Sequence, residues 1–397
     1  MANCSIWNGA CKWRLIPDRL LDDLTTMNNR IRIIHAESFE LDPGPLPVPF
    51  SDSTMGPFTH WKMPWLRLTA DDDTTGEAPT SLHPIVRPML FTVGGAHGLT
   101  PEEWHHKFFW MLRNNGHRSP DTSGFLWGFD VALRDILAKR AGQPWHRHMG
   151  AIRDEVPVYG SGGSTGFTED ELLADMRAMV ASGFRTVKMK VAKNFGQHMN
   201  EDVARVKAVR REIGDDIGLA IDGNQAWTAE QATEFAKRIE DQNIAWFEEP
   251  VQAADRQAIR NICKACSIPI AMGESENSAL SFQDLFECGV RHIQPNPGAL
   301  PGFTAWKQAL SWAEKAGELW TCGGFSHLTA MFVATRQDGM VEYLRSIIGH
   351  LATCWKQKPL ELNGTFLLPK TPGLPVTVDW DGLHKRNAVR VIANDRA

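Results

Sequence analysis

Three acidic residues occupy the same place relative to the apolar segments of this sequence. Asp222, Glu248 and Glu274 follow short apolar runs in AIDGN, WFEEP and AMGES, and they lie 26 residues apart. Such runs predict buried strands, and neighbouring parallel strands end at one edge. Three carboxylates without Cys or His form a hard oxygen site suited to Mg²⁺ rather than Zn²⁺. A single acid there commonly caps the next helix, but three at matched positions favour a metal site.

Two lysines lie one segment earlier, in TVKMKV. Because side chains alternate along a strand, Lys188 and Lys190 share one face and Met189 takes the other. Two ammonium groups in a barrel interior repel each other and adjoin the predicted metal, and both effects lower a lysine pKa towards that of a usable base. Solvent-facing lysines give the same pattern, but parallel barrel strands are covered by helices. The pattern therefore favours a lysine base.

The later apolar segments add three polar residues, Asn296 in IQPNPG, His327 in GGFSHL and Glu342 in MVEYL. A histidine at a strand end is a natural acid–base partner. Taken alone, however, such a histidine is more often a packed, hydrogen-bonded residue. These three residues are therefore candidates, and whether they take part in catalysis depends on where the fold places them.

The elements that must position these residues form a repeating pattern of short strand, turn and amphipathic helix. Alternation of this kind predicts parallel βαβ units that close into a barrel. A doubly wound sheet is the alternative, but the polar residues recur at the carboxyl ends of the strands, where barrels gather their catalytic groups. The predicted strands span residues 156–160, 186–191, 218–222, 244–248, 268–272, 290–294, 318–322 and 340–344.

The remainder of the 397 residues predicts a second domain. Residues 1–150 read as an N-terminal α+β capping domain, whose Pro-rich loop 43–64 is a candidate lid over the site. Residues 151–360 form the catalytic barrel, and residues 361–397 return to the capping domain. The predicted capping strands span 31–42 and 65–72, and its helices 101–114 and 122–140.

Composition excludes several classes of partner. A formal charge of −5 gives no basic surface for nucleic acid or an anionic membrane. The sequence has neither a signal-peptide pattern nor an apolar run of membrane-spanning length. Seven cysteines in no paired framework suggest reduced thiols, and Cys263 and Cys266 form a lone C-x-x-C that lacks a second pair for zinc. We therefore expect a cytoplasmic protein whose partner is a small carboxylate substrate.

The ordered motifs K-M-K, D-G-N, E-E-P, G-E and S-H-L resemble the enolase superfamily, specifically its mandelate racemase-like subgroup. The resemblance runs from about residue 120 to about residue 345. It implies a (β/α)8-type TIM barrel, possibly in the modified β/α7β form, behind an N-terminal α+β capping domain. It also implies a homo-oligomer, since members are commonly dimers or octamers.

Carried to this sequence, the resemblance implies a magnesium centre and a lysine base. Asp222, Glu248 and Glu274 would bind Mg²⁺. Lys190 would remove a proton α to a carboxylate. Magnesium would assist this step by stabilising the negative charge of the enolate. Lys188 would set the pKa of Lys190.

The resemblance also implies roles for residues around the substrate. Asn224 would bind the substrate carboxylate, His327 would act on the face opposite the lysine, and Glu342 would be the acid that hydrogen-bonds the enolate oxygen. Asn296 is a departure, because this subgroup usually has an aspartate there that forms a dyad with the histidine. An amide orients the imidazole without adding charge, which weakens His327 as a base. Dehydration needs one base and one acid, so the departure favours a dehydratase over a racemase.

The predicted function is therefore magnesium-dependent dehydration of a sugar acid, an aldonate or aldarate, to a 2-keto-3-deoxy acid. A racemase or epimerase of a 2-hydroxy acid is the first alternative, and a non-catalytic metal- or acid-binding homologue is the second. A cycloisomerase of the muconate type would need a lysine near residue 296, but the nearest downstream is Lys307, within the next helix. A nicotinamide site at GSGGSTG fails because Thr165 stands where the motif needs its third glycine.

Overall fold

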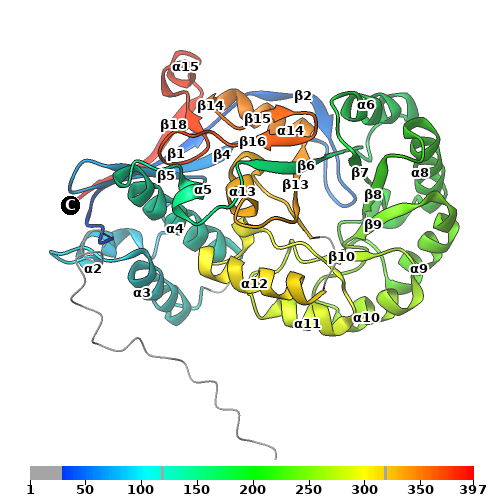
Figure 1. The fold of residues 1–397 in the computed structure, drawn as a ribbon, viewed down its shortest axis with the longest axis horizontal. Coiled ribbons are helices and arrows are strands. Elements are labelled where there is room, and N and C mark those ends of the chain that lie inside the picture. The colour runs from blue at the N-terminus through cyan, green and yellow to red at the C-terminus, as the bar shows by residue number, and fades with distance from the viewer. Residues whose placement is uncertain (1–28, 118–119, 317–319) are drawn as a thin grey trace, which may run out of the picture.

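The computed structural model of this chain describes residues 29–117, 120–316 and 320–397. A four-stranded antiparallel sheet and a larger sheet of parallel strands organise it, with helices around both (Figure 1). Part of the predicted strand 318–322 lies outside the described residues, as do Cys4 and Cys11. The remaining predicted strands and helices all appear, most of them within a few residues of their expected ends.

The antiparallel sheet has the strand order β18-β1-β4-β5. Helix α4 packs across β4 and β5, and helix α3 packs on α4. Helix α3 begins with a capping box, in which the side chains of Thr100 and Glu103 each bond the other's backbone N–H. In this sheet the last strand of the chain, β18, pairs with the first, β1. The domain boundaries remain a prediction. The elements are β1 (Ile33–Leu41), β4 (Met63–Ala70), β5 (Thr75–Ala78), β18 (Val389–Arg396), α3 (Pro101–Asn114) and α4 (Pro120–Arg140).

Eight parallel strands follow the path β11-β10-β9-β8-β7-β6-β13-β12. Chain order and spatial order agree except where the path passes from β6 to β13, as expected when the last strands close on the first. The strands are β6 (Glu155–Gly162), β7 (Thr186–Lys190), β8 (Gly218–Asp222), β9 (Ile244–Glu248), β10 (Ile270–Met272), β11 (His292–Ile293), β12 (Thr321–Cys322) and β13 (Met340–Leu344).

Side chains join the two end strands of this path. The Thr321 hydroxyl on β12 lies 3.0 Å from His292 Nε2 on β11 and accepts from Gln294 Nε2 at 3.0 Å. These bonds bring the two ends of the strand path together, so that the sheet closes into a barrel. The predicted fold class, an α/β barrel behind an N-terminal α+β domain, is confirmed.

Helices cover the outer face of the barrel. Their boundaries follow local chemistry: Thr168 and Glu171 form a capping box at α6, and Thr228 and Gln231 form another at α9. The helices are α6 (Glu169–Ala181), α7 (Lys193–Gly196), α8 (Met199–Ile213), α9 (Ala229–Arg238), α10 (Arg256–Ala265), α11 (Ser281–Cys288), α12 (Phe303–Ala316), α13 (Ser326–Val333) and α14 (Arg345–Leu351).

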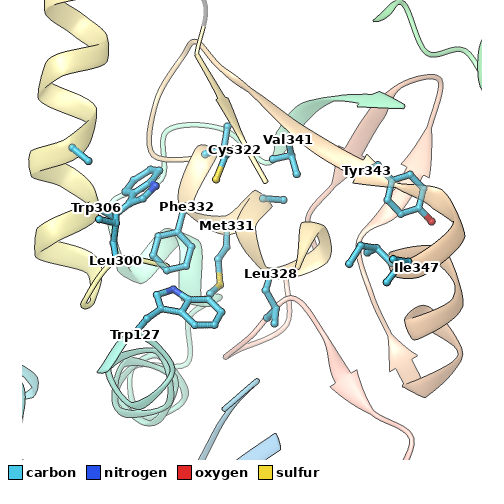
Figure 2. Close-up of a cluster of buried hydrophobic side chains, with 14 of the residues drawn as sticks. Trp127, Leu300, Trp306, Cys322, Leu328, Met331, Phe332, Val341, Tyr343 and Ile347 are labelled. Atoms are coloured by element: carbon cyan, nitrogen blue, oxygen red, sulfur yellow. The ribbon is translucent and has the colours of Figure 1, made fainter. Parts of the chain in front are cut away.

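Helix α13 lies between the barrel and the capping domain, and its residues are all buried. Figure 2 shows Phe332 of α13 beside Trp127 of α4 and Trp306 of α12. Its ring centroid lies 6.3 Å from that of Trp127 and 5.3 Å from that of Trp306. Aromatic packing therefore fixes the capping helix α4 against the barrel.

A hairpin reaches from the capping domain to the barrel. Its strands are β2 (Pro45–Phe50) and β3 (Phe58–His60), and the loop between them falls within the predicted lid. In Figure 1 the chain of β2 crosses towards β7, on the barrel side of the view. The short strands β14 (Trp355–Gln357), β15 (Leu360–Leu362), β16 (Thr365–Leu367) and β17 (Thr377–Val378) and helix α15 (Trp380–Lys385) follow the barrel.

Within the described ranges, none of the helices combines the length and the apolar character that crossing a bilayer requires.

Candidate active site

The two lysines of β7 face the barrel interior. Lys188 is 1% exposed and Lys190 is 7% exposed, while Met189 between them packs in the core outside the barrel. Lys190 is the register partner of Asp222 on β8, and its Nζ donates to Asp222 Oδ2 at 2.6 Å. The alternation predicted from the sequence therefore places both lysines at one end of the barrel.

Lys188 lies among three carboxylates. Its Nζ donates to Glu248, lies 2.8 Å from Glu342 Oε1 and lies 3.2 Å from Asp222 Oδ2. The strands β8, β9 and β13 each contribute one of these acids. Lys188 thus links acidic groups on both sides of β7.

The carboxylates change the pKa values expected for the lysines. Burial would lower the pKa of Lys188, but the charges of Glu248 and Glu342 raise it well above its usual value. Burial likewise opposes the ammonium of Lys190, yet Asp222 leaves its pKa raised. Among the protein groups alone, the two lysines repel each other less than the nearby acids attract them. The predicted lowering, which also invoked a bound metal, stays a prediction. Lys188 does lower the pKa of Lys190, as predicted, but by less than Asp222 raises it.

A group of three carboxylates lies beside these lysines. One oxygen from each of Glu248, Glu274 and Glu342 falls within 4.8 Å of the other two. Burial, together with the charges of neighbouring acids, raises the pKa values of Glu248 and Glu274 well above normal. A divalent cation between the oxygens would offset that repulsion, and an all-carboxylate donor set suits Mg²⁺. The residues present therefore fit the predicted metal.

Asp222 is paired with the two lysines, and its role as a metal ligand stays a prediction. Burial would raise its pKa, but Lys190 and Lys188 hold it far below its usual value. Its Oδ2 contacts both lysines, while Oδ1 accepts from the Asn224 backbone N–H at 2.9 Å. Asp222 is nevertheless the register partner of Glu248 on the next strand. The structure thus groups Glu342 with two of the three predicted ligands and leaves Asp222 beside them, on the lysines.

The predicted role of Glu342, as the acid that hydrogen-bonds the enolate oxygen, stays a prediction. Burial would raise its pKa, but the charges of Lys188 and Lys190 leave it lowered. The reason is direct contact, since Lys188 Nζ lies 2.8 Å from the carboxylate. The charges of the two lysines therefore favour the ionised form of Glu342.

His327 packs among aromatic side chains and not beside the lysines. The predicted role for it, acting on the substrate face opposite Lys190, is therefore corrected. It lies in α13, and its ring centroid is 5.2 Å from that of Phe366 and 5.7 Å from that of Tyr343. Tyr343 follows Glu342 on β13 and points the opposite way, towards Ile347 (Figure 2). Burial, followed by the charge of Lys358, lowers the pKa of His327 to about 3. His327 is thus a neutral packing residue.

The residue that faces the acids from the end of β12 is a glycine. A Cβ at Gly323 would lie 3.0 Å from Glu342 Oε2 and 3.8 Å from Glu274 Oε2. Gly323 and Gly324 lengthen the turn after β12, so the S-H-L motif begins helix α13 instead of ending the strand. Asn296 lies beside Gly324, and its Oδ1 accepts from the Gly298 N–H at 2.9 Å. The predicted dyad of Asn296 with His327 therefore does not form.

Replacing His327 by glutamine should consequently spare catalysis. We expect kcat and KM to stay within about threefold of wild type, while the free energy of unfolding falls by about 1–3 kcal/mol through lost ring packing. Steady-state kinetics and chemical denaturation measure the two effects separately. A fall in kcat of more than about 100-fold in a stably folded variant would show that His327 takes part in catalysis.

Three further residues were missed by sequence reasoning. Gln294 donates to Glu248 Oε2 at 2.6 Å, and its alternation with His292 along VRHIQ was an available signal. Ser53 of the lid is 1% exposed, and its hydroxyl lies 3.2 Å from Asn224 Oδ1. Buried Arg205 of α8 donates to the Ser164 carbonyl at 2.7 Å, beyond the end of β6. The contacts of Ser53 and Arg205 join segments far apart in sequence, so no local pattern reveals them.

Comparison with known proteins places the chain among enzymes. The family model for enolase C-terminal domain-like proteins matches residues 171–382. A 3,6-anhydro-alpha-L-galactonate cycloisomerase of Streptomyces coelicolor is 26% identical over 85% of this chain and 95% of its own length. An L-talarate/galactarate dehydratase of Salmonella typhimurium is 33% identical over 47% of each chain.

A solved structure agrees with the fold. The crystal structure of a racemase from Streptomyces coelicolor with bound magnesium has a TM-score of 0.78 and 25% identity. The match covers 89% of this chain and 99% of that one.

Proposed function

This chain belongs to the enolase C-terminal domain-like family, and we propose that it dehydrates a sugar acid to a 2-keto-3-deoxy acid by removing the proton α to the carboxylate. It is an enzyme of the enolase superfamily, a lyase or an isomerase. The observation that carries the finer proposal is the placement of buried Lys190 beside Asp222 and the carboxylate cluster. This arrangement offers a base and a place for a cation within one end of the barrel.

Glu248 and Glu274 would hold the metal, with Asp222 as the third ligand. Asp222 supports this assignment by its position, because it ends β8 next to Glu248 in register. Glu342, by contrast, lies in the middle of β13, opposite Tyr159, and not at the end of its strand. Mg²⁺ bound there would offset the acid charge around the lysines and stabilise the negative charge that develops on the substrate.

The chain's own residues account for the proton transfers. Asn224 orients the substrate carboxylate, and neutral Lys190 takes the proton from the α-carbon. The bond from the β-carbon to its hydroxyl then breaks, and the new Lys190 ammonium returns a proton to the departing hydroxide, forming water. The remaining enol tautomerises to the 2-keto acid, so atoms and charge balance.

Gly323 favours dehydration over the racemase alternative. Inversion at a carbon needs a second proton donor on the face opposite the lysine. Gly323 offers no side chain there, and Asn296, beside the neighbouring Gly324, is an amide that does not titrate. Within the described residues, Lys190 is then the group positioned to carry both proton transfers.

Incubation of wild-type enzyme with Mg²⁺ and a panel of sugar acids in D₂O tests the proposal. We expect 2-keto acid to accumulate from at least one acid, detected by ¹H NMR and by a keto-specific reagent. Formation of the epimer with deuterium at the α-carbon, and no keto acid, would establish the racemase instead. Bound acid that shows neither exchange nor product would identify the non-catalytic homologue.

A further inference from the structure

One side chain joins the three loops that follow β8, β9 and β10. Gln225 lies in the loop after β8, three residues beyond Asp222. Its Nε2 donates to Glu249 Oε2 at 2.9 Å and to the Ser275 hydroxyl at 2.8 Å. Its Oε1 accepts from the Ala253 N–H at 2.8 Å. Because Glu249 and Ala253 follow β9 and Ser275 follows β10, a single carboxamide bonds all three loops together.

The partners of this amide are the immediate neighbours of proposed metal ligands. Glu249 directly follows Glu248, and Ser275 directly follows Glu274. A carboxylate can reach a metal only from where its own backbone is held, so a bond to the next residue limits the movement of the ligand. Gln225 therefore controls how far apart the loops bearing these ligands lie.

The backbone around Gln225 is held in the same way. The Gln225 N–H donates to the Glu249 carbonyl at 2.7 Å. Gln225 has a φ of 63° and Glu249 a φ of 38°, in the left-handed region that residues other than glycine seldom adopt. Such conformations persist where surrounding contacts hold them. The two residues thus form a constrained junction between the loops after β8 and β9.

Glu249 shows what the loss of the amide would do. This carboxyl group is 2% exposed, and its Oε1 has no hydrogen-bond partner among the described residues. The amide of Gln225 therefore offsets much of the cost of burying Glu249. Without that donor the carboxyl group would gain by moving towards water, and it would take the adjoining Glu248 with it.

We propose that Gln225 is a positioning residue for the metal centre, whose amide fixes the spacing of the loops that carry Asp222, Glu248 and Glu274. Mg²⁺ requires near-ideal octahedral geometry with short bonds, whereas Ca²⁺ accepts a more variable set of oxygen ligands. Fixed spacing therefore matters more for Mg²⁺ than for Ca²⁺. The inference rests on the metal ligands of the proposed function and assigns a residue that acts through them.

Replacing Gln225 by leucine removes both donors and the acceptor while keeping a side chain of similar size. Isothermal titration of the substrate-free protein with Mg²⁺ or with Ca²⁺ measures the effect without relying on activity. We expect the Kd for Mg²⁺ to rise about 10–100-fold, and the Kd for Ca²⁺ to change by less than about threefold. The preference for Mg²⁺ over Ca²⁺ should therefore fall about 10-fold or more.

Two further variants calibrate this result. Ser275→Ala removes one of the three side-chain bonds at the exposed end of the amide, so we expect a smaller rise in the Kd for Mg²⁺, in the same direction. Adding Ser275→Ala to Gln225→Leu should raise that Kd no further, because the bond is already lost. Gln252→Leu makes the same substitution at an exposed position of the loop after β9 and should bind both cations as wild type does.

The possible outcomes separate this inference from the proposed function. Unchanged Mg²⁺ binding in Gln225→Leu and Ser275→Ala overturns the inference and leaves the metal site standing. Equal weakening of Mg²⁺ and Ca²⁺ also overturns it, because Gln225 would then stabilise the loops without selecting a geometry. If wild type binds no Mg²⁺ at all, the metal site of the proposed function fails and the inference falls with it.

Discussion

Replacing Lys190 by alanine should lower kcat by about 10³–10⁴-fold or more, which is the range expected when a general base is removed. Lys190 Nζ is 2.6 Å from Asp222, and the other lysine of the site, Lys188, is paired with Glu248 and Glu342. The same variant should lose exchange of the α-proton with D₂O, because exchange needs only the first proton transfer. Both rates can be measured on one sample by ¹H NMR. Exchange that continues at the wild-type rate would assign the base elsewhere.

Lys188 provides the control, since it touches the acids but is not expected to take the proton. Its charge lowers the pKa of Lys190, so Lys188→Met should raise that pKa. Lys190 acts as a base only when it is neutral, and activity therefore rises as pH increases through its pKa. The rising limb of the pH–rate profile should move to higher pH in Lys188→Met and stay near its wild-type position in Lys188→Arg. Identical profiles for wild type and Lys188→Met would show that Lys188 does not affect the pKa of Lys190.

The sequence predicted the barrel well because the signals for parallel strands are local. Each strand is a short apolar run that ends in a polar residue, and alternation within TVKMKV determines which side chains face inwards. Register between neighbouring strands then brings Lys190, Asp222 and Glu248 to one end of the barrel. The positions of these residues could be predicted from the two-residue period of a strand and from the rule that the ends of parallel barrel strands lie together.

His327 shows where sequence reasoning failed. The S-H-L motif has the right composition and approximate spacing, but Gly323 and Gly324 add length between the end of β12 and the motif. The histidine therefore enters α13 and packs against Phe366, a residue of a strand that follows the barrel. Such a contact depends on tertiary packing, which single-sequence patterns do not contain.

The pKa values of the charged groups in the site also could not be predicted from the sequence. Counting two lysines in one strand predicts mutual repulsion, but the pKa values depend on how many acids approach each ammonium group. Glu342 comes from β13, more than 150 residues away, and lies 2.8 Å from Lys188. Its lowered pKa follows from that contact, and the raised pKa of Lys188 follows from Glu248 first and then Glu342. Similarly, the contact between Ser53 and Asn224 joins the lid to the barrel across a long stretch of sequence.

Removal of one proposed metal ligand should produce the second large effect. Glu274→Gln should weaken Mg²⁺ binding and lower kcat/KM by about 10²–10³-fold or more, because a ligand and a charge are both lost. Glu274 is suitable because it has no ion pair among the described residues. Glu276→Gln is the matched control, since Glu276 pairs with Arg256 and lies outside the carboxylate cluster.

Isothermal titration with Mg²⁺ and the shift in melting temperature on adding Mg²⁺ report binding without relying on activity. A ligand that binds only the folded state stabilises it by about 2.7 kcal/mol at 100 times its Kd, so wild type and Glu276→Gln should show a clear Mg²⁺-dependent shift that Glu274→Gln loses. Asp222→Asn and Glu342→Gln then identify the third ligand. We expect Asp222→Asn to lose the shift, because Asp222 ends β8 beside Glu248, and Glu342→Gln to retain it, because Glu342 lies in the middle of β13. The reverse result would make the cluster of Glu248, Glu274 and Glu342 the metal centre and leave Asp222 as the partner of Lys190.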